Sequence, residues 1–145
     1  MARDANESVH SGQCFCGAVR VEVRGEPVTQ GYCHCQSCRS HSGALVRGFT
    51  LWPEDTVSVT KGELAGFNKM GFSDRRHCTV CGGQVLIGHP TIGMMDVHAS
   101  TIPDFPFQPT LHVNYQEHVV AIRDGLPKLR DMPAEIGGSG QTMAE

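Results

Sequence analysis

Residues 12–23 read GQCFCGAVRVEV, and this stretch combines the two features that decide the fold. Cys14 and Cys16 form a CxC between two glycines, the composition of a tight turn in which backbone amides can approach the sulfurs. Directly after this turn, residues 18–23 alternate apolar and polar side chains, which is the period of a β-strand with one buried face. A cysteine-bearing turn leading into a strand is therefore the first unit that we expect.

Short strands separated by turns continue along the chain. The sequence has 17 Gly and 8 Pro in 145 residues, a share that favours many turns and argues against a helical bundle. Apolar or alternating runs predict further strands at 31–33, 44–52, 57–60, 67–72, 75–78, 84–87, 94–98 and 110–115, with a helical turn or short loop at 36–42. The expected fold class is therefore mainly β.

A single domain is expected for most of the chain. A hydrophobic share of 39% over 145 residues suits one packed core. Residues 1–11 are polar and predict a flexible N-terminal arm, and residues 12–125 are expected to form the β domain. From 126 onward, an Asp-Met-Pro run and a Gly-Gly-Ser-Gly run predict a mobile C-terminal tail over 126–145.

The charge balance narrows the class of partner. Twelve Lys and Arg against 15 Asp and Glu give a formal charge of −3, which argues against binding to nucleic acid or to an anionic membrane. No stretch approaches the ~20 apolar residues of a membrane span, and residues 1–12 lack the apolar core of a signal peptide. We therefore expect a cytoplasmic protein with small-molecule or protein partners, and a homo-oligomer is left open.

The cysteines indicate metal rather than disulfides. An odd count of seven, in a chain expected to meet a reducing compartment, is a poor basis for a disulfide framework. Tetrahedral zinc needs its sulfurs only about 3.8 Å apart, so its ligands come in close groups on tight turns. All seven cysteines stand in three such groups: Cys14 and Cys16, then Cys33, Cys35 and Cys38, then Cys78 and Cys81.

Spacing favours a division of the seven into four and three. Sequence separation alone does not say which groups join, but Cys33, Cys35 and Cys38 are near enough to converge on one metal unaided. The remaining four, Cys14, Cys16, Cys78 and Cys81, would then close a second site. Four-ligand zinc sites are structural, whereas three protein ligands with an open position are the arrangement of catalytic zinc.

The fourth position of the three-cysteine site decides between a structural and a functional interpretation. His41, three residues past Cys38, is the better protein candidate to fill it. His34 is a poor candidate, because in an extended segment its side chain points away from those of its two cysteine neighbours. An iron–sulfur cluster is a lesser alternative, since CxC is not a usual spacing for its ligands.

The three cysteine motifs together resemble one known family. GQCFCGAV from Gly12, CHCQSCR from Cys33 and CTVCGG from Cys78 are similar to the glutathione-dependent formaldehyde-activating family, which includes relatives of centromere protein V. The resemblance runs from about Gly12 to Tyr115. It implies a zinc-stapled, twisted two-sheet β fold of the methionine sulfoxide reductase B and Rab-accessory zinc protein type. It also implies two Zn²⁺ per chain, divided between the cysteines as their spacing suggests.

The resemblance further implies an activity. The family is linked to the addition of formaldehyde to glutathione, which gives S-(hydroxymethyl)glutathione, a carbon–sulfur lyase reaction run in reverse. Glutathione would be the co-substrate, and the partners would be a small-molecule thiol and an electrophile. Catalysis would pass through the open zinc on Cys33, Cys35 and Cys38; we expect His41 to donate a proton and Arg39 to contact a glutathione carboxylate.

Two other functions compete with this interpretation. The chain could be a non-catalytic zinc-binding module for protein interaction, in which case the second zinc has its fourth position filled by protein. Methionine sulfoxide reduction is disfavoured, because it needs a free thiolate nucleophile and all seven cysteines are assigned to metal. An exchangeable fourth ligand would distinguish an enzyme from a binding module.

Overall fold

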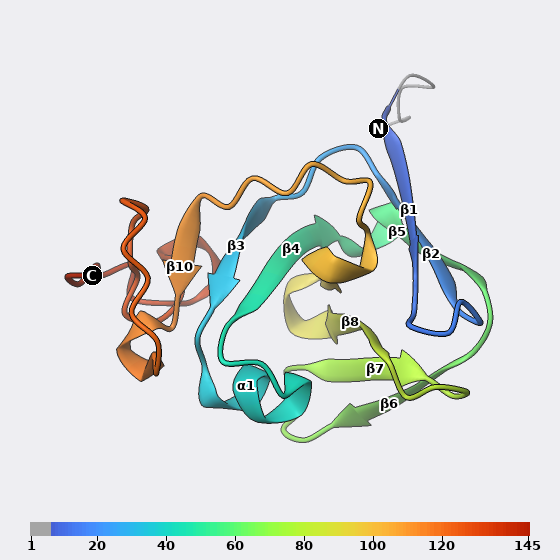
Figure 1. Ribbon diagram of the computed structural model, residues 1–145. Coiled ribbons are helices and arrows are strands. Elements are labelled where there is room, and N and C mark those ends of the chain that lie inside the picture. Colours follow the sequence, from blue (N-terminus) through green and yellow to red (C-terminus); the bar gives the residue numbers. More distant parts are fainter. Residues whose placement is uncertain (1–6) are drawn as a thin grey trace. The chain divides into compact units, whose positions relative to one another are not determined.

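The computed structural model describes residues 7–145 and is mainly β (Figure 1). The chain divides into two compact units, and each is built from two separate stretches. The first unit comprises Met1–Val28, described from residue 7, with Thr50–Pro106; the second comprises Thr29–Phe49 with Phe107–Glu145. The prediction of a single domain over 12–125 stays a prediction.

In the first unit, a three-stranded antiparallel sheet has the order β1-β2-β5. Its strands are β1 (Val9–Gln13), β2 (Arg20–Arg24) and β5 (Val57–Lys61). The alternation in the sequence is confirmed in β2, where Val21 and Val23 are fully buried and the residues between and beside them are not.

Strand β1 begins inside the segment expected to be a flexible arm. Val9 pairs with Arg24 of β2, so residues 9–11 lie in a strand. The flexibility of an arm over 1–11 stays a prediction, and residues 1–6 lie outside the described part of the chain. Backbone pairing rather than apolar periodicity holds this strand. The strand needs glycine at position 12, because the Cβ of any other residue would lie only 1.9 Å from the carbonyl oxygen of Thr101.

Further strands of the first unit have the order β4-β9-β8-β7-β6, to which β4 contributes its last residues. They are β4 (Arg47–Pro53), β9 (Met94–His98), β8 (Gln84–His89), β7 (Asp74–Cys78) and β6 (Leu64–Asn68), with the short 3-10 helices η1 (Glu54–Thr56), η2 (Pro90–Ile92) and η3 (Ala99–Thr101). Trp52 is fully buried in the core, and its indole N–H donates to Thr50 Oγ1 at 2.8 Å.

The strand expected at 67–72 ends early. β6 stops at Asn68, whose side-chain oxygen accepts a hydrogen bond of 2.6 Å from the amide of Gly71. Gly71 has a φ of 83°, a conformation that interrupts a strand and that glycine adopts most readily. The turn therefore occupies the second half of the predicted strand, and β7 starts at Asp74.

In the second unit, β3 (Thr29–Cys33) leads into the α-helix α1 (Gln36–Ser42) and then into the first residues of β4. β10 (Leu111–Val113) pairs in parallel with β3, and the 3-10 helices η4 (Tyr115–Glu117) and η5 (Ala134–Ile136) follow. Gly31 allows the close pairing, because a Cβ there would lie 2.1 Å from the carbonyl oxygen of Leu111. Within residues 7–145, no helix has the length and apolar character needed to cross a membrane.

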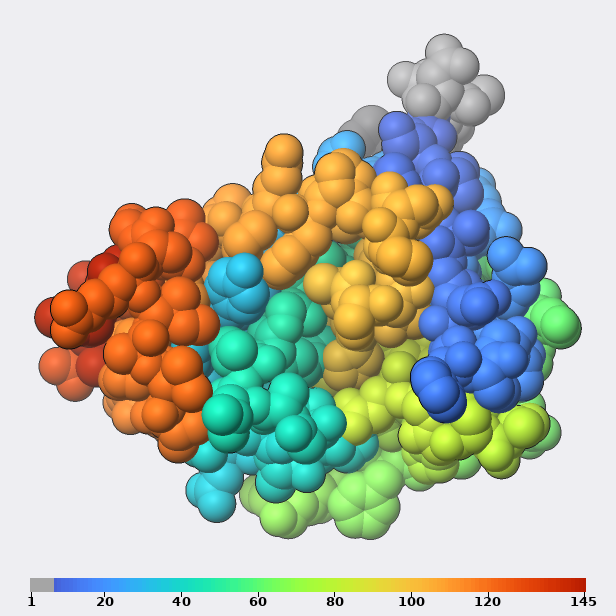
Figure 2. All heavy atoms as spheres, viewed as in Figure 1, coloured from blue at the N-terminus to red at the C-terminus, as the bar shows by residue number. Residues whose placement is uncertain are grey.

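Residues 126–145 make many contacts within the second unit. The amide of Leu129 donates to His112 of β10 at 2.9 Å, the amide of Tyr115 donates to Leu129 at 3.0 Å, and the side chain of Lys128 is buried. Figure 2 shows the chain beyond residue 120, in orange to red, as a packed group of atoms. The sequence predicts no packed element here, and the structure differs because the backbone of this segment pairs with that of β10; its mobility stays a prediction.

Candidate metal centres

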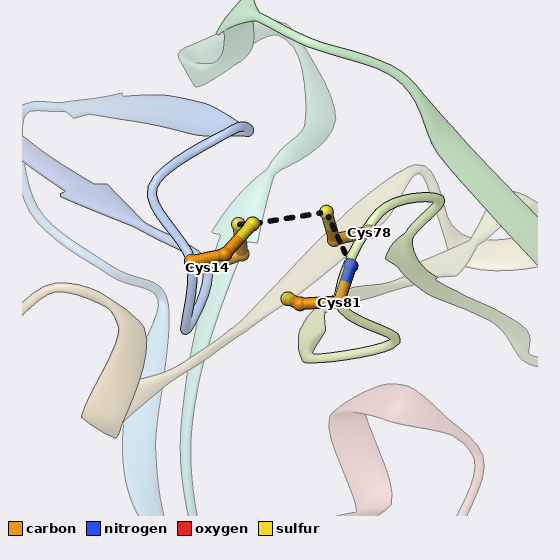
Figure 3. Close-up of side chains that lie close together, drawn as sticks. Cys14, Cys78 and Cys81 are labelled. Atoms are coloured by element: carbon orange, nitrogen blue, oxygen red, sulfur yellow. Dashed lines mark hydrogen bonds between the residues drawn. The ribbon is translucent and has the colours of Figure 1, made fainter.

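The first unit brings four cysteines together, as their spacing predicts. Cys14 and Cys16 lie on the turn after β1, while Cys78 ends β7 and Cys81 lies on the turn before β8 (Figure 3). The sulfurs of this four-cysteine cluster all lie within 4.8 Å of one another. The Sγ of Cys16 is 3.7 Å from that of Cys14 and 3.8 Å from that of Cys78, which is close to the sulfur separation around a tetrahedral zinc ion.

Backbone amides surround these four sulfurs. Tight turns after each cysteine pair aim N–H groups back at the sulfurs, and such hydrogen bonds favour the ionised thiolate, the form that binds metal. The donors are Val19 to Cys14 at 3.3 Å, Ala18 to Cys16 at 3.4 Å, Val80 to Cys78 at 3.3 Å and Gly83 to Cys81 at 3.3 Å.

The electrostatics of the four-cysteine cluster fit a cation. Burial raises the pKa of the Cys14 thiol, but hydrogen bonds from the Val19 amide and from neighbouring thiols lower it to about 6. The Ala18 amide lowers the pKa of Cys16, but desolvation and the other three cysteines together raise it to about 11. One thiolate thus suppresses the ionisation of its neighbour, and a divalent cation is what allows all four sulfurs to be ionised together.

The second unit brings together Cys33, Cys35 and Cys38, whose sulfurs also lie within 4.8 Å of one another. Cys33 ends β3 and Cys38 lies in α1. Cys35 is the N-cap of α1, and its sulfur accepts a hydrogen bond of 3.2 Å from the Cys38 amide. Hydrogen bonds with the other two thiols, reinforced by burial, raise the pKa of Cys33 well above its ordinary value. The chemistry of this three-cysteine cluster therefore also fits a metal cation.

Among residues 7–145, no His, Asp or Glu joins the three sulfurs as a fourth close ligand. His41 lies in α1 but is not brought into this cluster. Three sulfurs of the second unit thus converge without the fourth protein ligand that a closed site needs.

Asn114 is a residue of this site that the sequence does not reveal. Its side-chain amide donates to the sulfur of Cys33 at 3.6 Å and to the sulfur of Met132 at 3.6 Å. Its φ of 54° is the only left-handed value of a non-glycine residue in the described chain. Asparagine tolerates this conformation, but the residue lies 81 positions from Cys33 and no local pattern connects the two.

Arg39 connects α1 to the rest of the second unit. Its Nε donates to the carbonyl oxygen of His34 at 3.1 Å, and its Nη2 donates to the carbonyl oxygen of Glu117 at 3.2 Å. A guanidinium has five N–H donors, so these two bonds leave donors for a carboxylate. The glutathione contact expected for Arg39 stays a prediction.

His34 lies between two of the cysteines but is engaged elsewhere. Its ring is fully buried, and its Nε2 lies 2.8 Å from Nδ1 of His112, which is fully buried as well. Burial above all, with a contribution from nearby cationic groups, lowers the pKa of His34 to about 4, so the ring is neutral at pH 7. Like His41, His34 is not part of the three-cysteine cluster.

Comparisons with known proteins agree with this geometry. The family model of the glutathione-dependent formaldehyde-activating enzyme matches residues 9–117, which contain both cysteine clusters. A crystal structure of a Rhodobacter sphaeroides protein is similar in fold, with a TM-score of 0.52 and 21% sequence identity over 66% of this chain and 89% of that one. No curated protein matches. Since the family model covers most of the sequence, the chain belongs to the glutathione-dependent formaldehyde-activating enzyme family.

Proposed function

We propose that the chain is a zinc-dependent carbon–sulfur lyase that acts on a glutathione adduct and resembles an S-(hydroxymethyl)glutathione synthase. The observation that carries the proposal is the three-cysteine cluster, which in the described chain has no fourth protein ligand. A metal held by three protein ligands keeps a position for a substrate, whereas the four-cysteine cluster has the ligand number of a structural site.

Each cysteine cluster is proposed to hold one Zn²⁺. The four-cysteine cluster would staple the turn after β1 to the end of β7, and the three-cysteine cluster would form the open site. Zinc bound at the open site would supply a positive charge that keeps a thiol ionised or polarises the oxygen of the electrophile.

The protein's own residues have three proposed tasks at the open site. Asn114 donates to the Cys33 sulfur and so holds that ligand in place. Arg39 offers its remaining donors to a carboxylate of glutathione, whose negative charge needs a local cation in a chain of formal charge −3. His41, in the last turn of α1, is the proposed proton donor.

The proposed reaction balances without a redox partner. The sulfur of glutathione forms a bond to the carbonyl carbon of the electrophile while the carbonyl π bond breaks, and a proton passes to the resulting oxygen. The lyase direction breaks the same carbon–sulfur bond and returns the proton. The partners are therefore a small-molecule thiol and an electrophile, of which formaldehyde is the family's example.

The finer fold type and the location are part of the proposal. We assign the sheets to the twisted two-sheet type of methionine sulfoxide reductase B and the Rab-accessory zinc proteins; the mainly β strand content supports this. A cytoplasmic location follows from the requirement for reduced thiols in both clusters.

A non-catalytic zinc module for protein interaction is the second candidate. It is favoured by two apolar side chains that stand in solvent on the turns of the four-cysteine cluster: Phe15 is 93% exposed and Val80 is 75% exposed. Exposed apolar side chains that gather into a patch mark protein-binding surfaces.

The test combines metal analysis with exchange kinetics. Zinc per chain and the number of sulfurs per zinc, from X-ray absorption, are measured with and without glutathione, and exchange NMR measures the interconversion of ¹³C-formaldehyde and its glutathione adduct. We expect two zinc ions, a sulfur count that rises with glutathione, and exchange faster than in buffer. Two zinc ions whose coordination ignores glutathione, together with exchange at the buffer rate, would favour the binding module.

A further inference from the structure

A series of hydrogen bonds runs from the three-cysteine turn through two buried histidines to Asp124 at the surface. Nε2 of His34 lies 2.8 Å from Nδ1 of His112, and Nε2 of His112 lies 2.8 Å from Oδ2 of Asp124. Both rings are fully buried and stack with their centroids 5.1 Å apart. At full burial no water competes for the bond between the two rings, so each of its two nitrogens has one defined role as donor or acceptor.

The far oxygen of Asp124 is fixed by two donors. Oδ1 accepts from the ammonium group of Lys128 at 2.7 Å and from the amide of Leu126 at 3.1 Å. Lys128 is buried, and its ammonium group also donates to the carbonyl oxygen of Leu126 and to the carboxylate of Glu145. An oxygen is therefore required at the Oδ1 position whatever residue stands at 124.

These contacts determine which ring nitrogen of His112 and of His34 carries a hydrogen. An ionised carboxylate only accepts, so Nε2 of His112 carries a hydrogen. For rings that each carry one hydrogen, Nδ1 of His112 is then a lone pair, and Nε2 of His34 must donate to it. The remaining nitrogen of His34, Nδ1, is a buried lone pair without a partner among the described residues.

His34 is also held through its backbone. Its amide donates to the carbonyl oxygen of Val113 at 3.2 Å, and its carbonyl oxygen accepts from Nε of Arg39 at 3.1 Å. Ring, amide and carbonyl are thus all anchored at the one residue that separates Cys33 from Cys35. Any rotation of this residue would move both sulfurs.

We propose that Asp124, oriented by Lys128, is a positioning residue for the three-cysteine site: it sets the tautomer of His112 and, through it, that of His34, and so fixes the turn that carries Cys33 and Cys35. The inference rests on the metal-binding role that the proposed function gives these cysteines, but not on the identity of the substrate. His112, Asp124 and Lys128, which carry this role, all lie outside the three cysteine motifs.

Replacement of Asp124 by asparagine reverses the chain of hydrogen bonds. Lys128 and the Leu126 amide keep the amide oxygen on their side, so the NH₂ group of Asn faces Nε2 of His112, which must then accept. His112 would carry its hydrogen on Nδ1 and donate to His34, whose hydrogen moves to Nδ1. That nitrogen has no described acceptor, and a buried N–H without a partner is costly.

The experiment uses the full chain with zinc in the four-cysteine cluster and cobalt(II) as the probe of the three-cysteine cluster. Two-bond ¹H–¹⁵N spectra at pH 8 give the tautomers of His34 and His112, and the thiolate-to-cobalt charge-transfer band gives the affinity. The wild type should carry hydrogen on Nε2 of both rings. Asp124→Asn should move it to Nδ1 of both and lower the cobalt affinity about tenfold or more, as is typical when a residue behind a metal ligand is changed.

Matched variants separate positioning from general damage. Asp131→Asn alters another carboxylate of the same unit, bound to Ser139, and should leave tautomers and cobalt affinity unchanged. His112→Gln retains an acceptor for His34 and a donor for Asp124 and should bind cobalt nearly as the wild type does, whereas His112→Leu should not. This pair replaces Asp124→Asn if that variant fails to fold.

Three results would overturn the proposal. One is a wild-type His34 with hydrogen on Nδ1, which needs no variant to observe. Another is an Asp124→Asn protein with unchanged tautomers, and the third is a reversal of both tautomers at unchanged cobalt affinity. Since neither readout involves glutathione, a chain that makes no glutathione adduct would disprove the proposed function and leave this inference standing.

Discussion

The side-chain amide of Asn114 donates to the sulfur of Cys33 across 3.6 Å, from a backbone in the left-handed conformation with φ of 54°. The left-handed backbone and the hydrogen bond can be tested separately. Asn114→Gly keeps the conformation and removes the bond, whereas Asn114→Ala removes the bond and adds strain of about 1 kcal/mol. We expect both to release zinc from the three-cysteine cluster several times more readily than the wild type in a chelator competition. In urea unfolding, only the alanine variant should also lose the stability that corresponds to this strain. If both variants retained zinc as well as the wild type does, the hydrogen bond would have no role in holding the metal.

The two cysteine clusters should respond differently to loss of one sulfur. Cys78→Ser removes a ligand from the closed cluster in the core of the first unit and should unfold the protein or leave it with at most one zinc. Cys35→Ser should keep the fold and the first zinc, because serine still caps α1, but should abolish catalysed exchange of the glutathione adduct. Elemental analysis and thermal melting check both. Equal losses of stability in the two variants would refute the division into structural and functional sites.

Asp124 should make stability depend on pH in the acid range. Burial raises the pKa of its carboxyl, but hydrogen bonds from Lys128 and His112 hold it well below the ordinary 3.8. A carboxyl whose pKa is depressed by folding stabilises the folded state above its unfolded pKa and loses this effect as the pH falls toward the folded value. Urea unfolding gives the free energy of unfolding of the wild type and of Asp124→Asn. The difference between the two should therefore be constant above pH 5 and shrink below pH 4. A difference that stays constant as the pH falls below 4 would contradict this role of the Asp124 carboxyl.

Close pairing of β3 and β10 should make Gly31 sensitive to a single methyl group. A Cβ at Gly31 would lie 2.1 Å from the carbonyl oxygen of Leu111, so Gly31→Ala must push the two strands apart and should cost about 2 kcal/mol or more. Gly43→Ala is the control, because a Cβ there meets open space and only the left-handed φ of 73° is penalised, by about 1 kcal/mol. Urea unfolding measures both; a smaller loss at Gly31 than at Gly43 would contradict the close approach of these two strands.

The three-cysteine cluster and several strands could be predicted because their signals are local. The spacing of Cys33, Cys35 and Cys38 permits convergence on one metal, and the alternation around Val21 and Val23 indicates a strand. Strand β1 has no such periodicity. Its position depends on backbone pairing with β2 and on Gly12, where a Cβ would clash with the carbonyl oxygen of Thr101.

Long-range partners account for the parts of the site that could not be predicted. Asn114, His112 and Asp124 each act on a residue at least 12 positions away, and their roles exist only once β10 lies beside β3. The composition around residues 131–140 indicates disorder, but backbone hydrogen bonds hold this segment, among them those from the Asn114 amide to Asp131 and from the Gly140 amide to Met132. Hydrogen bonds between main-chain atoms leave almost no trace in amino-acid usage.

Cys35 has two tasks, as a member of the three-cysteine cluster and as the N-cap of α1, whose sulfur accepts from the Cys38 amide at 3.2 Å. A sulfur that gives electron density to a metal accepts a hydrogen bond differently from a free thiol. Metal binding at the cluster and the geometry of the first turn of α1 are therefore coupled. The chemical shift and the solvent-exchange rate of the Cys38 amide proton should therefore report whether the cluster holds a metal ion.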